Sequence, residues 1–228
     1  MAGNPEHTPV SPLGGVKAFS CPNCGGQVEL RAPGQVMTAV CRHCESLLDV
    51  TDENFRLLQR FQEKMNIKPR IELGSRGKID GRTWEVVGFQ LRQAVGFNYY
   101  WEEYLLFNPH LGFMWLLNQY GHWSLTRTMV DLPQSAARGS NITYKGETFR
   151  KYSTGKAKVV FVLGEFYWEI KRGDVADTRD YVANGKMLSA EMDAYGLNWT
   201  FSDYISEKEV RKIFPEVALQ KKEGVAPH

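Results

Sequence analysis

Four cysteines are the residues whose type and spacing indicate chemistry most clearly. Cys21, Cys24, Cys41 and Cys44 form two Cys-x-x-Cys pairs that are separated by sixteen residues. Two such pairs can supply four thiolates to one tetrahedral zinc ion. Because four thiolates leave no open position for water or substrate, we expect a single structural zinc ion rather than a catalytic one.

Other uses of these cysteines are weaker alternatives. Disulfides would suit an exported chain, but the first residues lack the basic and apolar regions of a secretory signal. A redox Cys-x-x-Cys normally opens a helix after a strand. His43 lies inside the second pair and could replace a cysteine. Since four thiolates already complete the ligand set, we expect His43 to be a solvated neighbour.

Short apolar runs between and after the cysteine pairs predict a zinc ribbon over residues 17–50. A segment this small cannot fold on apolar burial alone, and zinc can contribute on the order of 10 kcal/mol or more to its folding. The ribbon has three basic and three acidic residues. This balance disfavours binding to nucleic-acid phosphates, which requires a basic excess.

The segments that flank the ribbon and the main domain are also assigned. Phe55, Leu58, Phe61 and Met65 have helical spacing, and therefore a linker helix is predicted over 51–69. Residues 1–16 are expected to be disordered, and residues 218–228 are expected to form a flexible tail.

From residue 70 to residue 217 the pattern changes to short β-rich runs between turn residues. Asp80-Gly81 is a strong hairpin signal. We expect a mainly β chain with an antiparallel sandwich or barrel-like domain and a short C-terminal helix. Two weak internal matches suggest two related halves, at about 71–130 and 139–217. The matches place Gly81, Thr83 and Trp84 against Gly146, Thr148 and Phe149, and Trp123 against Trp199.

Aromatic residues are concentrated between residues 97 and 123. They could line a groove for a peptide or a flexible ligand. We favour the alternative that they fill the core of the β domain, because many of them alternate with aliphatic residues.

A local basic excess marks one candidate binding surface, for which nucleic acid, anionic lipid and an acidic protein are the possible ligands. The alternative is an exposed strand that lysines keep soluble and unpaired. The residues of this candidate surface are Arg150, Lys151, Lys156 and Lys158.

Catalytic motifs are missing from the sequence. There is no phosphate-binding loop, no Gly-x-Ser-x-Gly and no His-Glu-x-x-His. Glu102 and Glu103 are adjacent in a predicted strand, so they point to opposite faces and cannot act as an acid–base pair. We therefore expect a protein that is not an enzyme.

Several aromatic motifs resemble a bacterial family catalogued as domain of unknown function 4178, over about residues 71–215. A four-cysteine ribbon before the domain is also similar to the arrangement in that family. The resemblance implies an uncharacterised bacterial protein and brings no established activity or catalytic residue. The motifs that carry it are Leu73-Gly74-Ser75-Arg76-Gly77, Trp84-Glu85-Val86-Val87-Gly88, Trp101-Glu102-Glu103-Tyr104, Gly121-His122-Trp123-Ser124 and Trp199-Thr200.

These features predict a non-catalytic, zinc-containing binding or adaptor protein that engages a protein or a membrane-associated complex. A net charge of +2 argues against a dedicated nucleic-acid coat, and no apolar run reaches the roughly 18 residues of a membrane span. We expect a location in the cytoplasm or at the inner face of the membrane, and no small-molecule substrate is indicated. The alternatives are a nucleic-acid-binding ribbon protein and an enzyme with a site between the two halves.

Overall fold

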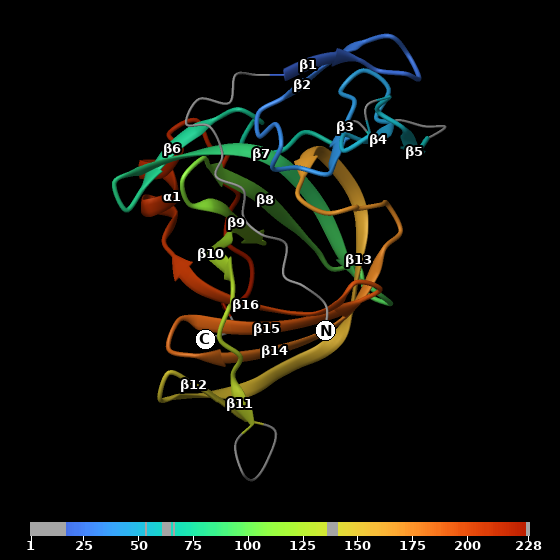
Figure 1. Ribbon diagram of the computed structural model, residues 1–228. Helices are drawn as coiled ribbons and strands as arrows, with labels where there is room; N and C mark the ends of the chain where they lie inside the picture. Colours follow the sequence, from blue (N-terminus) through green and yellow to red (C-terminus); the bar gives the residue numbers. More distant parts are fainter. Residues whose placement is uncertain (1–16, 53, 61–64, 66, 136–140, 227–228) are drawn as a thin grey trace.

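The computed structural model describes residues 17–52, 54–60, 65, 67–135 and 141–226. Within this part of the chain the fold is mainly antiparallel β with one short helix, as predicted. The expected disorder of residues 1–16 concerns residues outside the described part. In Figure 1 a small N-terminal region, drawn in blue, lies on one end of a larger β body.

The N-terminal region consists of two small sheets. Strands β1 (Lys17–Ser20) and β2 (Gln27–Leu30) form a hairpin. Strands β3 (Thr38–Val40), β4 (Leu47–Asp49) and β5 (Leu57–Gln59) form the second sheet. A small apolar cluster lies between the sheets and includes Val28, Leu30 and Leu48. We refer to residues 17–60 as the ribbon.

The predicted linker helix over 51–69 is wrong for the residues that the structure describes, while residues 53, 61–64 and 66 lie outside them. Phe55 has a left-handed φ of 52°, which a helix does not allow, and its ring stacks on Phe19 at 3.6 Å. Residues 57–59 pair with β4 as strand β5. Tertiary pairing with the ribbon therefore overrides the helical spacing of the apolar residues.

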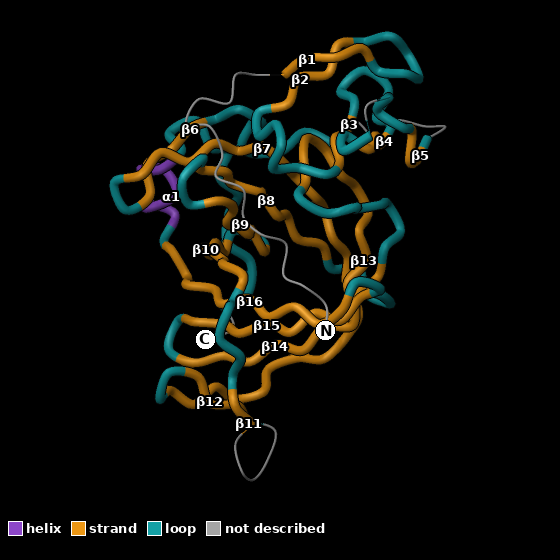
Figure 2. Tube along the Cα trace, in the orientation of Figure 1, coloured by secondary structure: helices purple, strands orange, loops and turns teal. Residues whose placement is uncertain are grey.

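The larger body is a closed antiparallel barrel of eight strands, which confirms the barrel-like expectation. Its strand order is β7-β8-β9-β10-β16-β15-β14-β13, and β13 pairs with β7 to close it. Figure 2 shows the strands in orange and helix α1 in purple. The strands are β7 (Arg82–Ala94), β8 (Tyr100–Asn108), β9 (Gly112–Gln119), β10 (His122–Thr128), β13 (Glu147–Phe166), β14 (Val175–Ala183), β15 (Lys186–Asp193) and β16 (Gly196–Ile205).

The two parts of the barrel have the same order of elements. Each begins with a short strand, β6 (Arg76–Ile79) or β12 (Ile142–Tyr144), followed by a two-residue turn and a long strand. Asp80-Gly81 and Lys145-Gly146 have matching positive φ angles, which is typical of a type I′ hairpin. A meander of three further strands completes each part, and β11 (Gln134–Ser135) pairs with β12. Corresponding strands meet at both seams, β7 with β13 and β10 with β16.

The largest apolar cluster lies on the outer face of strands β6 to β10 and includes single residues of β13 and β16. Helix α1 (Glu207–Ile213), which begins with a Ser206 capping box, covers this face through Val210. On β8 the alternation of side chains places Tyr104 and Leu106 in this outer cluster, while Leu105 belongs to a separate cluster on the inner face.

A tight backbone crossing requires glycine where β13 leaves the barrel. Gly164 has a φ of +87°, and a Cβ atom there would lie 2.2 Å from the Val87 carbonyl oxygen. Val87 is itself the extra residue of a bulge in β7, between Val86 and Gly88. This close approach bends β13 toward the ribbon, and Glu165 and Phe166 then pair with β3.

The expected flexible tail is instead in contact with the barrel up to residue 226. The Ala218 amide donates to the Arg70 carbonyl, and the Glu223 amide donates to the Tyr120 carbonyl. The Lys222 Nζ atom lies 2.9 Å from the Tyr204 hydroxyl. A short polar tail gives little sequence signal of such docking, because most of its contacts use the backbone.

Candidate functional site

The four cysteines come together at one point of the ribbon. Their sulfur atoms all lie within 4.8 Å of one another. The Cys21 and Cys44 Sγ atoms are 3.8 Å apart, and those of Cys24 and Cys41 are 3.7 Å apart. A disulfide needs about 2.05 Å, whereas four thiolates at about 2.3 Å from one tetrahedral ion lie about 3.8 Å apart. The cluster therefore has the geometry of a metal centre and could hold one ion.

Two matching turns position the sulfur atoms. The Cys21 amide donates to the Gly26 carbonyl, and the Cys41 amide donates to the Ser46 carbonyl. The residue after each pair has a positive φ, which is 74° at Gly25 and 57° at Glu45. Glycine adopts this conformation freely, whereas a side chain there costs about 1 kcal/mol or more. The backbone alone therefore fixes both pairs toward the same centre.

His43 is not among the clustered ligand atoms. Its ring lies against the first turn, where a Cβ atom on Gly26 would meet the ring carbons at 2.5 Å. The side chain is exposed, and the four sulfur atoms already supply a full tetrahedral set.

The ribbon is attached to the barrel by backbone pairing and by one buried carboxylate. Strand β3 pairs with the end of β13, and the Thr38 hydroxyl donates to the Trp168 carbonyl. Glu165 is 3% exposed and accepts the amide protons of Arg31 and Ala32 at 2.7 and 2.9 Å. Burial raises the pKa of Glu165 to about 7, although both amides favour the charged form. The cysteine cluster thus belongs to a ribbon that strand pairing and a buried carboxylate connect directly to the barrel.

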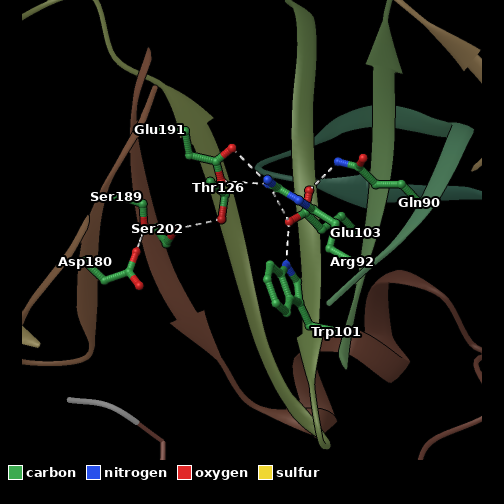
Figure 3. A network of polar contacts seen from close by, with 9 residues as sticks. All are labelled: Gln90, Arg92, Trp101, Glu103, Thr126, Asp180, Ser189, Glu191 and Ser202. Carbon is green, nitrogen blue, oxygen red and sulfur yellow. Dashed lines mark hydrogen bonds and ion pairs between the residues drawn. The ribbon is translucent and has the colours of Figure 1, made fainter. Parts of the chain in front are cut away.

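The interior of the barrel contains a polar network, which Figure 3 shows from close by. Arg92 on β7 reaches across the interior to Glu191 on β15, with Nη1 lying 2.7 Å from Oε1. Arg92 also lies 3.5 Å from Glu103 on β8, whose carboxylate accepts protons from the Gln90 amide and the Trp101 indole. Since β7 and β15 are not neighbours in the sheet, this face of the strands must be the inner one.

Hydroxyl and carboxylate side chains extend this network along the second half of the barrel. Thr126 and Ser202 share a hydrogen bond of 2.7 Å, and Asp180 accepts protons from the Ser153 and Ser189 hydroxyls. Burial raises the pKa of Asp180, while the two hydroxyls oppose the shift. Burial likewise raises the pKa of Glu103, and Arg92 opposes it.

Sequence reasoning missed this network. The available signal was the pattern of polar residues at alternate positions in a strand that is otherwise apolar, such as Gln90 and Arg92. Such a pattern shows that the side chains share a face, but not what they meet across the barrel. The prediction for Glu102 and Glu103 is consistent with the structure. Glu102 accepts a proton from the Tyr104 hydroxyl on the outer face, while Glu103 lies inside.

The four predicted basic residues all lie exposed on β13. Lys156 forms an ion pair of 2.8 Å with Asp177. Arg150 and Lys151 are adjacent on the strand and therefore point to opposite faces. The structure does not gather Arg150, Lys151, Lys156 and Lys158 on a single face.

The aromatic segment over 97–123 is partly buried, with three of its ten rings buried, five half-buried and two exposed. Tyr104 and Trp123 are at most 1% exposed and pack in the outer cluster, and Trp115 packs inside against Trp168. Phe97 and Tyr99 are exposed, at 70% and 39%. Half of the rings of this segment therefore contribute to the two cores on either side of the sheet.

The barrel carries the family identity of the chain. Residues 72–207 match the family described as domain of unknown function (DUF4178). The chain belongs to this family. No curated protein and no solved structure matches it. The DUF4178 domain contains the whole interior network, whereas the four cysteines lie before it.

A membrane-spanning helix is also not found in the part of the chain that the structure describes. The single helix there, α1, has 7 residues, which is far too short to cross a bilayer.

Proposed function

We propose that this chain is a non-catalytic binding protein in which one structural zinc ion fixes the ribbon to the end of the DUF4178 barrel. The observation that supports it is the cluster of four sulfur atoms within 4.8 Å of one another, next to a strand that pairs with β13. Soft thiolate ligands in tetrahedral geometry favour zinc. A filled set of four thiolates suits structural use of the metal.

The engagement of the interior side chains supports a non-catalytic role. Glu103, Asp180 and Glu191 each accept a hydrogen bond or form an ion pair within the barrel. His122 contacts the Glu223 carbonyl on the surface. A general base needs a free, solvent-reachable position near its substrate. These side chains are instead committed to one another.

A protein partner is the most suitable ligand for the surface. Large apolar side chains are exposed at the loops, including Phe97 at 70% and Tyr195 at 66%. The net charge of +2 favours neither nucleic acid nor an anionic membrane. We propose that the protein acts in the cytoplasm by engaging a protein or a membrane-associated complex.

Metal analysis of the purified full chain tests the metal part of this proposal. We expect one equivalent of zinc in the natural sequence and in Ser20→Ala, which changes an exposed neighbour of Cys21. Cys41→Ser should lose the ion, because Cys41 is fully buried in the cluster. A chain without metal, or with its cysteines oxidised in pairs, would contradict the proposal.

Cross-linking in cells tests the binding part, with Phe97→Asp compared with Asp131→Asn at another exposed position. Recovery of one protein by the natural chain and by Asp131→Asn, but not by Phe97→Asp, is the expected result. Recovery of nothing specific, or recovery of nucleic acid that disappears as salt rises, would contradict it.

A further inference from the structure

A cavity of about 230 Å³ lies between the ribbon and the barrel. Its walls come from β2 and the second cysteine turn on one side and from β7 and β13 on the other. This volume lies somewhat below the range of about 300–1,000 Å³ for drug-sized ligands and suits a smaller organic molecule. The site lies apart from the polar interior of the barrel, and the proposed zinc does not fill it.

The floor of the cavity is aliphatic. Val28, Ala39 and Val87 line it, and each is at most 5% exposed. Pockets for small molecules combine such an apolar lining with a few convergent polar groups. An aliphatic group on a ligand would find its complement here.

A buried carboxylate lies in the same wall. Glu165 lines the cavity and receives only backbone amide protons from Arg31 and Ala32 among the residues that the structure describes. The Arg31 guanidinium is directed to Glu85, at 2.7 Å, rather than to Glu165. The Arg31 guanidinium, which also lines the cavity, acts on Glu165 only as a nearby charge, and burial raises the pKa of Glu165 in spite of it. A ligand ammonium group would give Glu165 a cation in direct contact.

A positively charged side chain lies at the rim of the cavity. Arg42 lines the cavity, is exposed, and forms no ion pair with any residue in the described ranges. His43 lies beside it, and Glu29 on β2 is the second acid of the rim. The cavity therefore combines a buried carboxylate, an exposed guanidinium and an aliphatic lining.

We propose that this cavity binds a small zwitterion of the α-amino-acid type. The ligand ammonium faces Glu165, its carboxylate faces Arg42, and its aliphatic part lies over Val28, Ala39 and Val87. A purely anionic ligand would be repelled by Glu165 and Glu29, and a purely cationic one would leave Arg42 without a partner. The proposal rests on the proposed function, because the docked, metal-bound ribbon forms half of the site.

Calorimetric titration of the full, metal-loaded chain with the twenty α-amino acids tests this proposal. The best binder is then compared with its amide, which lacks the carboxylate, and with its deaminated acid, which lacks the ammonium. We expect one saturable site for the amino acid, with affinity at least about tenfold lower for each analogue. Arg42→Ala should lower the affinity by a similar factor, while Lys151→Ala on the exposed part of β13 should not change it.

Three results would overturn the proposal. They are the absence of binding by any amino acid, equal binding of the amide or the deaminated acid, and an Arg42→Ala affinity equal to that of Lys151→Ala. The analogue series uses the natural sequence and does not depend on the folding of a variant. Zinc is measured in the same samples, so a metal-loaded chain without ligand binding counts against this inference alone. A folded chain without zinc counts against the proposed function.

Discussion

Arg92 and Glu191 are in direct contact across the barrel, although β13 and β14 stand between their strands in the sheet. The Arg92 Nη1 atom lies 2.7 Å from one Glu191 oxygen and 2.9 Å from the other. Such a contact can form only when the sheet is closed, and it therefore specifies the closed form over open arrangements of the same strands. We therefore expect this ion pair to contribute to the specificity of the fold, a role that buried ion pairs have in some proteins.

Removal of the arginine should be costly, because the carboxylate of Glu103 would stay buried without its cation. Arg92→Met keeps about the same volume but removes this cation and the partner of the half-buried Glu191. We expect a loss of about 3–5 kcal/mol in the free energy of unfolding, measured by urea denaturation. Arg127→Ala, at an arginine that is about half exposed, should change it by about 1 kcal/mol or less. Equal effects of the two substitutions would show that the cross-barrel pair is unimportant.

The crossing at Gly164 predicts a second sensitive position. Gly164→Ala places a methyl group 2.2 Å from the Val87 carbonyl oxygen and also adds strain at a φ of +87°. The matched control is Gly173→Ala, where φ is +98° but nothing lies within 4 Å. We expect about 1–2 kcal/mol of destabilisation for the control and clearly more for Gly164→Ala. Equal midpoints in urea would contradict the tight crossing.

Glu165 predicts a pH dependence of stability. Its pKa is raised from 4.5 to about 7 in the folded protein, so the folded state binds this proton more tightly than the unfolded chain. The contribution is fully present below pH 4.5 and is lost as the pH rises through about 7. The full effect is about 3 kcal/mol, of which about 2 kcal/mol falls between about pH 5.5 and 8.

Glu165→Gln is the variant that tests this dependence. The amide cannot ionise, and therefore the decline in stability between about pH 5.5 and 8 should be flatter than in the natural sequence. Gln should also lower stability throughout, because its NH₂ group cannot accept an amide proton. Asp131→Asn, at an exposed acid, is the control and should leave the slope unchanged. Parallel curves for all three chains would refute the prediction.

Metal removal should act first on the ribbon. Val40 and Leu47 pack against the inner cluster of the barrel, so unfolding of the ribbon exposes one end of that cluster. We expect a chelator to open residues 17–50 to limited proteolysis while residues 72–207 remain protected, as read by mass spectrometry. The cleavage pattern of the chelated protein should match that of Cys41→Ser. Unchanged cleavage after complete loss of metal would show that the ion has no structural role.

The sequence predicted best those features whose signal is local. The spacing of Cys21, Cys24, Cys41 and Cys44 led to the metal cluster, because two turns of known geometry determine it. The Asp80-Gly81 turn likewise identified the starting hairpin of the first half, and the match of Gly81 to Gly146 indicated its counterpart in the second half. The predicted short C-terminal helix is also present, as the only helix in the described part of the chain, and it begins with the Ser206 capping box.

Features that depend on distant pairing could not be read in the same way. Leu58 has helical spacing with Phe55, Phe61 and Met65, but it lies in strand β5, which pairs with the edge of β4. Arg92 and Glu191 are 99 positions apart, and only closure of the barrel brings them together. The cavity under Arg42 depends on how the ribbon sits on the barrel, which no periodicity of either part reveals.

The pairing of corresponding strands at both seams also indicates how the two halves of the barrel are related. Because β7 meets β13 and β10 meets β16, each antiparallel, an approximate two-fold axis relates the halves. Two copies of one half, related by the same two-fold axis, could pair through the same two edge strands. The barrel thus resembles a homodimer that is linked into one polypeptide, and this link allows the halves to differ. The first half supplies Arg92 and the second half supplies its partner Glu191.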